Sequence, residues 1–107
     1  MILSIHQPAY IPWLGYYDRI AKSDLFVLLD TVQYQKNSFQ NRNKIRIKKG
    51  WSWLTVPINT KKELFDKNIN QIRIDYKQNW KIKHLKTIEQ SYSKTKNFNT
   101  IFPIIEK

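Results

Sequence analysis

Cysteine is absent from the 107 residues, and glycine occurs only twice, as Gly15 and Gly50. Without cysteine the chain forms no disulfide, has no thiolate nucleophile and holds no Cys-ligated zinc or iron–sulfur site. Two glycines are too few for a Walker A loop or a GxGxxG fingerprint. The longest apolar run, residues 25–29, is too short to span a membrane. No signal peptide is visible, so we expect a soluble cytoplasmic protein.

A mass of 13.0 kDa and a hydrophobic content of 41% suit one domain, residues 1–107, with a modest core. Basic residues outnumber acidic ones, 19 to eight, and the net charge is +11. Residues 1–35 hold two bases and three acids, whereas residues 36–107 hold 17 bases and five acids. An excess of this kind points to an anionic partner, and nucleic acid is one such partner.

The type of basic residue favours a different explanation. Lysine occurs 15 times and arginine four times, whereas specific phosphate and base contacts favour the planar guanidinium of arginine. Lysine, asparagine and isoleucine have codons rich in A and T, so base composition alone can raise their number. We therefore favour a basic surface that reflects composition, and keep a nucleic-acid-binding module as the alternative.

The first 30 residues predict a β-α-β unit. Residues 2–5 form a short β-branched run typical of a buried strand, and the continuous apolar run 25–29 is typical of a strand buried on both faces. After the first strand, Pro8 and Pro12 keep the chain irregular, and Pro12 biases Ile11 toward extended geometry.

A helix over residues 13–21 is predicted between the two strands. Its apolar residues recur at the spacing of one helix face: Leu14, Tyr17, Ile20 and Ala21. A helix that connects two strands of this kind makes them parallel, with a right-handed crossover.

The rest of the chain predicts a hairpin and a helix. Residues 44–48 alternate between polar and apolar, Lys49-Gly50 marks a turn, and residues 51–57 return, so region 39–58 predicts a β-hairpin. Ile69, Ile72 and Ile74 suggest a short strand, and a helix runs from Asn79, its N-cap, to about Thr95. Phe98 to Ile105 is helical or extended. The fold class is therefore α/β, and the open sheet looks incomplete.

The candidate catalytic residues follow the two predicted parallel strands. His6 and Gln7 follow the first strand and Asp30 follows the second, and ligands of open α/β sheets bind at this end of the strands. An unperturbed histidine side chain has a pKa near neutrality. His6 is therefore our candidate acid–base or charge-stabilising group, with Asp30 as its orienting partner. Gln7 could orient a substrate hydroxyl. The alternative for His6 is a structural histidine, for Gln7 a loop amide, and for Asp30 an exposed turn residue. One Asp and one His are too few to predict a metal, and we expect no cofactor.

Five further residues are candidate substrate contacts. Tyr10 lies between two prolines and is a candidate platform for a sugar or a base, with core packing as the alternative. Gly15 within a helix costs about 1 kcal/mol against alanine, so it marks a close approach by a strand or a ligand. Arg42 can bind a phosphate or carboxylate bidentately, with Asn41 and Asn43 beside it. The alternative for these three residues is the polar shoulder of a hairpin.

Trp51 and Trp53 share a parity and point to one side of their strand. They could form a platform for a sugar or pack in the hydrophobic core, and core packing is favoured for at least one of them.

Several motifs resemble the WbqC-like family of bacterial proteins. They are IHQPAYIPWLGY at 5–16, DRIAKSD at 18–24, VQY at 32–34, FQNRN at 39–43, WLTVP at 53–57 and IEQSY at 88–92. The family is associated with O-antigen and other surface-polysaccharide gene clusters, and its members are normally about twice this length. The resemblance implies the N-terminal half of a transferase acting on an activated or amino sugar. The anionic substrate would then be a sugar nucleotide, held by Arg42 with Asn41 and Asn43. The donor, the acceptor and the oligomeric state do not follow from it.

Overall fold

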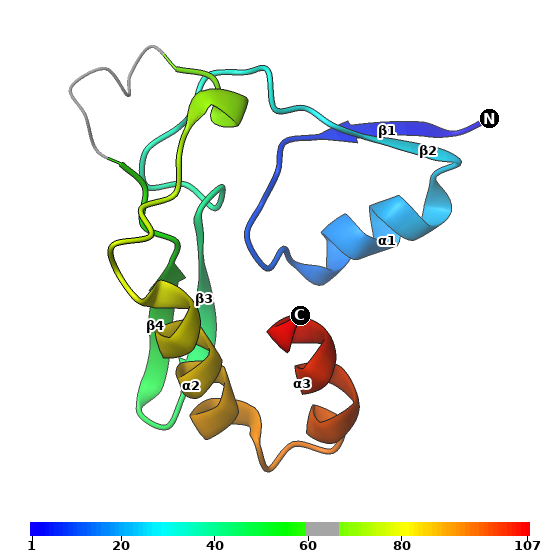
Figure 1. Ribbon diagram of the computed structural model, residues 1–107. Coiled ribbons are helices and arrows are strands. Elements are labelled where there is room, and N and C mark those ends of the chain that lie inside the picture. The colour runs from blue at the N-terminus through cyan, green and yellow to red at the C-terminus, as the bar shows by residue number, and fades with distance from the viewer. Residues whose placement is uncertain (60–66) are drawn as a thin grey trace. The chain divides into compact units, whose positions relative to one another are not determined.

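The computed structural model describes residues 1–59 and 67–107 (Figure 1). In chain order its elements are β1 (Leu3–His6), α1 (Leu14–Lys22), β2 (Leu25–Leu28), β3 (Arg42–Ile47), β4 (Gly50–Thr55), the 3-10 turn η2 (Ile69–Gln71), α2 (Trp80–Tyr92) and α3 (Phe98–Glu106). Strands β1 and β2 form one sheet, and β3 and β4 form another. The predicted class, an α/β fold with a β-α-β unit, a hairpin and C-terminal helices, is confirmed.

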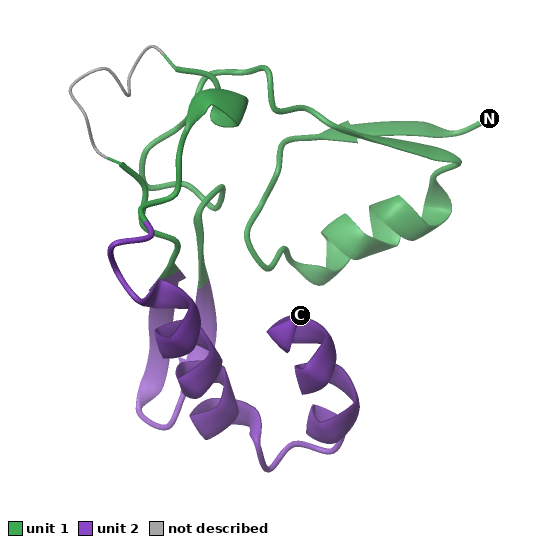
Figure 2. Ribbon diagram, viewed as in Figure 1, with its two compact units in different colours: residues 1–43, 55–75 green, residues 44–54, 76–107 purple. Residues whose placement is uncertain are grey.

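The chain divides into two compact units (Figure 2). Unit 1 comprises residues 1–43 and 55–75, and unit 2 comprises residues 44–54 and 76–107. Unit 1 therefore contains the β-α-β unit and η2, whereas unit 2 contains most of the hairpin and helices α2 and α3. The single domain expected from the length stays a prediction.

The β-α-β unit closes as a parallel pair. Leu3 of β1 is in register with Leu25 of β2, and His6 is in register with Leu28. The N–H of Leu29 donates to the carbonyl of His6 at 2.8 Å. Both strands therefore end at the same edge of the sheet, as the sequence predicts.

One face of this sheet is open. Leu3, Ile5 and Leu25, which point to this face, are each 51% exposed. The prediction that β2 is buried on both faces is therefore wrong for this chain, although parallel strands usually are. Helix α1 lies on the opposite face.

Helix α1 packs through a different face from the predicted one. The predicted stripe is largely exposed, with Leu14 at 87%, whereas Tyr16 is only 4% exposed. Tyr16 is buried because its ring packs edge-on against Phe26 of β2 at 5.4 Å and its hydroxyl donates to the Gln7 carbonyl.

The core of unit 2 lies between the hairpin and α2. Ile45 and Leu54 of the hairpin and His84 and Ile88 of α2 are all buried. The N–H of Arg46 donates to the Tyr92 hydroxyl at 2.9 Å, which ties β3 to α2. Helix α2 starts after Asn79 as predicted, although the Asn79 side chain makes no capping hydrogen bond.

The segment predicted as a strand from Ile69, Ile72 and Ile74 has another structure. Residues Ile69–Gln71 form the single 3-10 turn η2. The Gln71 side chain accepts the N–H of Asn68 at 2.9 Å, and this capping box closes the turn. Ile74 does form one antiparallel bridge, with Ile58.

Candidate active site

Loop 7–12 and segment 39–43, both in unit 1, are joined by hydrogen bonds. The N–H of Tyr10 donates to the Phe39 carbonyl at 3.1 Å. The Gln40 amide donates to the Gln7 side-chain oxygen at 2.8 Å. The Asn43 amide donates to the Ile11 carbonyl at 2.6 Å. We call these three contacts the loop clamp; they bring together two polar segments that are distant in sequence.

The clamp holds loop 7–12 in an unusual conformation. Ile11 has a φ of 44°, in the left-handed region. A β-branched residue is strained there, at a cost of about 1–3 kcal/mol. The prediction that Pro12 makes Ile11 extended is therefore wrong. Asn43 binds the carbonyl of this residue and, at 3.3 Å, the carbonyl of Tyr10, so it stabilises the turn locally.

His6 ends β1 among aromatic rings. Its Nδ1 lies 2.9 Å from the Gln7 carbonyl oxygen. A carbonyl only accepts hydrogen bonds, so this contact places the proton of the neutral ring on Nδ1 and leaves the lone pair on Nε2. The rings of Trp13 and Tyr16 meet the imidazole edge-on at 5.3 and 4.9 Å. The arrangement fixes the ring and suits it to act as a base through Nε2.

Gly15 makes room for Trp13. A Cβ at Gly15 would lie 2.8 Å from the indole Nε1 of Trp13, closer than real Cβ contacts. The close approach expected at Gly15 is thus made by a side chain of the same loop–helix junction. The missing Cβ lets Trp13 fold back toward His6.

Asp30 lies two residues beyond β2, at the end of the sheet where His6 ends β1. The residue is half-buried, and its carbonyl accepts the N–H of Asn70 at 3.0 Å. The orientation of His6 by the Asp30 carboxylate stays a prediction.

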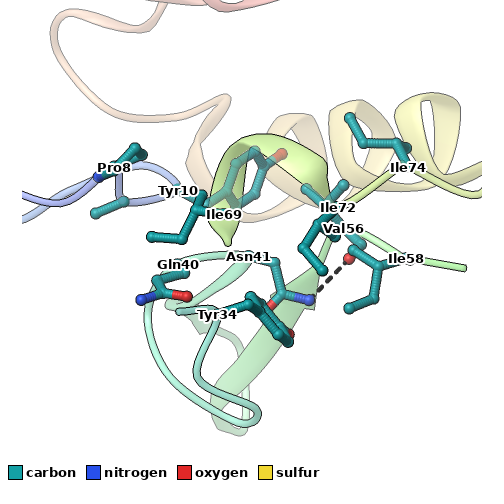
Figure 3. A pocket seen from close by; sticks show the side chains of 11 residues that line it. Pro8, Tyr10, Tyr34, Gln40, Asn41, Val56, Ile58, Ile69, Ile72 and Ile74 are labelled. Atoms are coloured by element: carbon teal, nitrogen blue, oxygen red, sulfur yellow. Dashed lines mark hydrogen bonds between the residues drawn. The ribbon is translucent and has the colours of Figure 1, made fainter. Parts of the chain in front are cut away.

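Unit 1 also contains a pocket of about 260 Å³ beside the loop clamp (Figure 3). Its apolar lining is Pro8, Ala9, Val56, Ile58, Ile69, Ile72 and Ile74, and its polar lining is Tyr10, Tyr34, Gln40 and Asn41. The Tyr34 hydroxyl donates to Asn41 at 3.2 Å, and the Asn41 amide donates to the Val56 carbonyl at 3.0 Å, the contact drawn in Figure 3. The residues that line this pocket are all uncharged, so it suits a neutral group with apolar and hydrogen-bonding parts.

Arg42 is half-buried at the start of β3. Its guanidinium donates to the Asn37 carbonyl at 2.7 Å. Its charge acts on the neighbouring Tyr34, whose pKa it lowers against a larger rise caused by burial.

Four of the six predicted substrate contacts fall into two groups. Tyr10 and Asn41 line the pocket, and Gln7 is joined to it through Gln40. Gly15 belongs instead to the aromatic surroundings of His6.

Tyr34 and the isoleucine wall were not predicted as site residues. Tyr34 reaches the pocket because its N–H donates to the Lys67 carbonyl at 2.9 Å. Ile69 does so because its own N–H donates to the Val32 carbonyl at 2.9 Å. Gln40, which also lines the pocket, belongs to the polar motif FQNRN at 39–43.

Burial raises the pKa of the pocket tyrosines Tyr10 and Tyr34 above the ordinary value of 10.0. As the pH rises above 10.0, the unfolded chain loses these protons first, so the free energy of unfolding falls until the folded-state pKa is passed. We predict that the double variant Tyr10→Phe/Tyr34→Phe loses less stability over this range than the parent, measured by denaturant unfolding. Tyr76→Phe removes a hydroxyl from an exposed ring and is the control. Equal losses in the parent and the double variant would contradict the burial of these hydroxyls.

The chain is similar to a known protein family and to a longer bacterial protein. Residues 7–107 match the WbqC-like protein family. The chain is also 38% identical over 99 residues to the uncharacterized protein Rv1507c of Mycobacterium tuberculosis, an alignment that covers 92% of this chain and 42% of that protein. The chain thus spans less than half the length of this curated relative. No solved structure matches it. The family match includes loop 7–12, segment 39–43 and the pocket lining, and the chain belongs to the WbqC-like protein family.

Proposed function

We propose that the chain acts in the biosynthesis of a bacterial surface polysaccharide, as the part of a transferase that binds an activated or amino sugar. Membership of the WbqC-like family supports the proposal. The sequence resemblance to this family implies an association with surface-polysaccharide gene clusters. The observation on which the ligand class rests is the uncharged pocket beside the loop clamp.

The pocket offers two kinds of contact. The isoleucines give an apolar wall, whereas Gln40 and the two tyrosine hydroxyls give hydrogen-bonding groups. An acylated amino sugar presents both a methyl group and an amide, so its acylamino group suits this lining. Pockets for small ligands commonly combine an apolar wall with a few placed polar groups.

An activated sugar also carries phosphate, which belongs outside the uncharged pocket. In our proposal Arg42 binds this phosphate, since a guanidinium presents a planar fork of donors to an anion. Asn41 and Asn43 support Arg42 by position, because their amides bind the Val56 and Ile11 carbonyls and so hold the pocket wall and the loop.

His6 supplies the acid–base chemistry of the proposal. The acceptor hydroxyl attacks the transferred group as the bond to the leaving phosphate breaks, and the hydroxyl proton passes to Nε2 of His6. Asp30, at the same end of the sheet, orients the protonated ring and balances its charge.

Binding of a sugar nucleotide tests the phosphate contact. We expect Arg42→Ala to weaken binding about 10- to 100-fold, the loss of one charge-assisted contact, in titration calorimetry against a panel of sugar nucleotides. Arg19→Ala, on the exposed surface of α1, removes the same charge and is the control. Equal weakening by both variants would show that net charge alone attracts the ligand.

Product formation tests the role of His6. In cells that depend on the complete encoded protein, we expect His6→Ala to lower glycan formation about 10²- to 10⁴-fold. Binding of the sugar nucleotide should change little, because the imidazole acts on the reaction and not on the phosphate. Wild-type product levels from both His6→Ala and Arg42→Ala would refute the site.

A further inference from the structure

One face of the hairpin in unit 2 combines lysine, arginine and tryptophan. Lys44 and Arg46 are exposed on the side of β3 opposite to the buried Ile45. Lys44 Nζ lies 4.2 Å from the ring centre of Trp51 and 5.1 Å from that of Trp53, which places both rings on this same face. We call Lys44, Arg46, Lys48, Trp51 and Trp53 the Trp–Lys face.

The face is accessible and amphipathic. Trp51 is 56% exposed, and Lys48 is exposed in the turn that joins β3 to β4. Trp53 is half-buried. Large indole rings thus lie beside ammonium groups on one exposed surface.

Charge is concentrated in the same unit. Unit 2 carries eleven basic and two acidic side chains, a net +9, whereas unit 1 carries eight and six, a net +2. Residues 42–55 contain no acidic residue. The charge of this face suits an anionic partner.

The ring geometry separates two classes of anionic partner. Single-stranded nucleic acids stack successive bases on aromatic ring faces. Here the two indole rings are at 89° to each other, and an ammonium group lies over the ring of Trp51. The face thus does not present two parallel rings for stacked bases.

A bilayer surface makes different demands. Tryptophan concentrates at the headgroup level of membranes, and lysine or arginine near anionic lipid is attracted by about 1 kcal/mol each, a factor of about five. Neither effect needs parallel rings. No helix in the described ranges 1–59 and 67–107 is long and apolar enough to cross a bilayer, so an association would be peripheral.

We propose that the Trp–Lys face docks unit 2 on the surface of an anionic lipid bilayer, with Trp51 at the headgroup level and the basic side chains against the lipid phosphates. The proposal stands apart from the proposed sugar site, which lies in unit 1.

Vesicle sedimentation tests the docking surface. The 107-residue chain is expected to bind vesicles that contain phosphatidylglycerol more tightly than pure phosphatidylcholine vesicles, and salt is expected to weaken this binding. Lys44→Ala/Lys48→Ala should lower the partition coefficient about 25-fold, fivefold for each charge. Trp51→Ala should reduce the blue shift of tryptophan emission on binding.

Two matched controls keep the test specific. Lys94→Ala/Lys96→Ala removes the same charge from exposed positions outside the face, and Tyr76→Ala removes an exposed aromatic ring. Both should bind vesicles more tightly than the corresponding face variants, and circular dichroism of every variant verifies that it is folded.

Three results would overturn the proposal. One is the absence of binding to phosphatidylglycerol vesicles at low salt. Another is an equal loss in the Lys94→Ala/Lys96→Ala control, which would leave net charge as the cause. The third is tighter, Trp51-dependent binding of a single-stranded oligonucleotide, which would assign the face to nucleic acid.

Discussion

The Asn43 amide, 2.6 Å from the Ile11 carbonyl oxygen, holds a loop whose backbone is strained at that residue. The strain costs about 1–3 kcal/mol. Each hydrogen bond of the loop clamp contributes a net of about 0.5–1.5 kcal/mol. The stabilisation by the three clamp hydrogen bonds and the cost of the strain are therefore of similar size. The path of loop 7–12 thus depends on segment 39–43.

Gln7 connects the two halves of the site through this loop. Its carbonyl accepts from His6 Nδ1 and from the Tyr16 hydroxyl, whereas its side chain accepts from Gln40 at the pocket. A shift of the loop would change two features together: the contact of His6 Nδ1 with the Gln7 carbonyl, which sets the tautomer, and the polar lining of the pocket at Gln40. In the proposed function, this coupling sets the sugar site and the acid–base group in one geometry.

Local pattern predicts much of the fold. Short β-branched runs, the helical spacing between them and the alternation before Gly50 predict the β-α-β unit and the hairpin, and the motifs predict the family. The buried face of α1 could not be predicted this way, because Tyr16 is selected by contacts with Gln7 and Phe26. The pocket wall could not be predicted from local pattern either. Ile69 and Tyr34 reach it through backbone contacts with Val32 and Lys67, which no local periodicity encodes.

A double-mutant cycle tests the clamp most directly. The free energy of unfolding would be measured for the parent, Asn43→Ala, Ile11→Gly and the double variant. If Asn43 holds Ile11 in its strained conformation, glycine at position 11 relieves strain only while Asn43 is present. The change in the free energy of unfolding caused by Ile11→Gly is then more favourable in the parent than in the Asn43→Ala background, by at least about 0.5 kcal/mol. Effects that add to within about 0.3 kcal/mol would show that the Asn43 amide does not hold the strained loop.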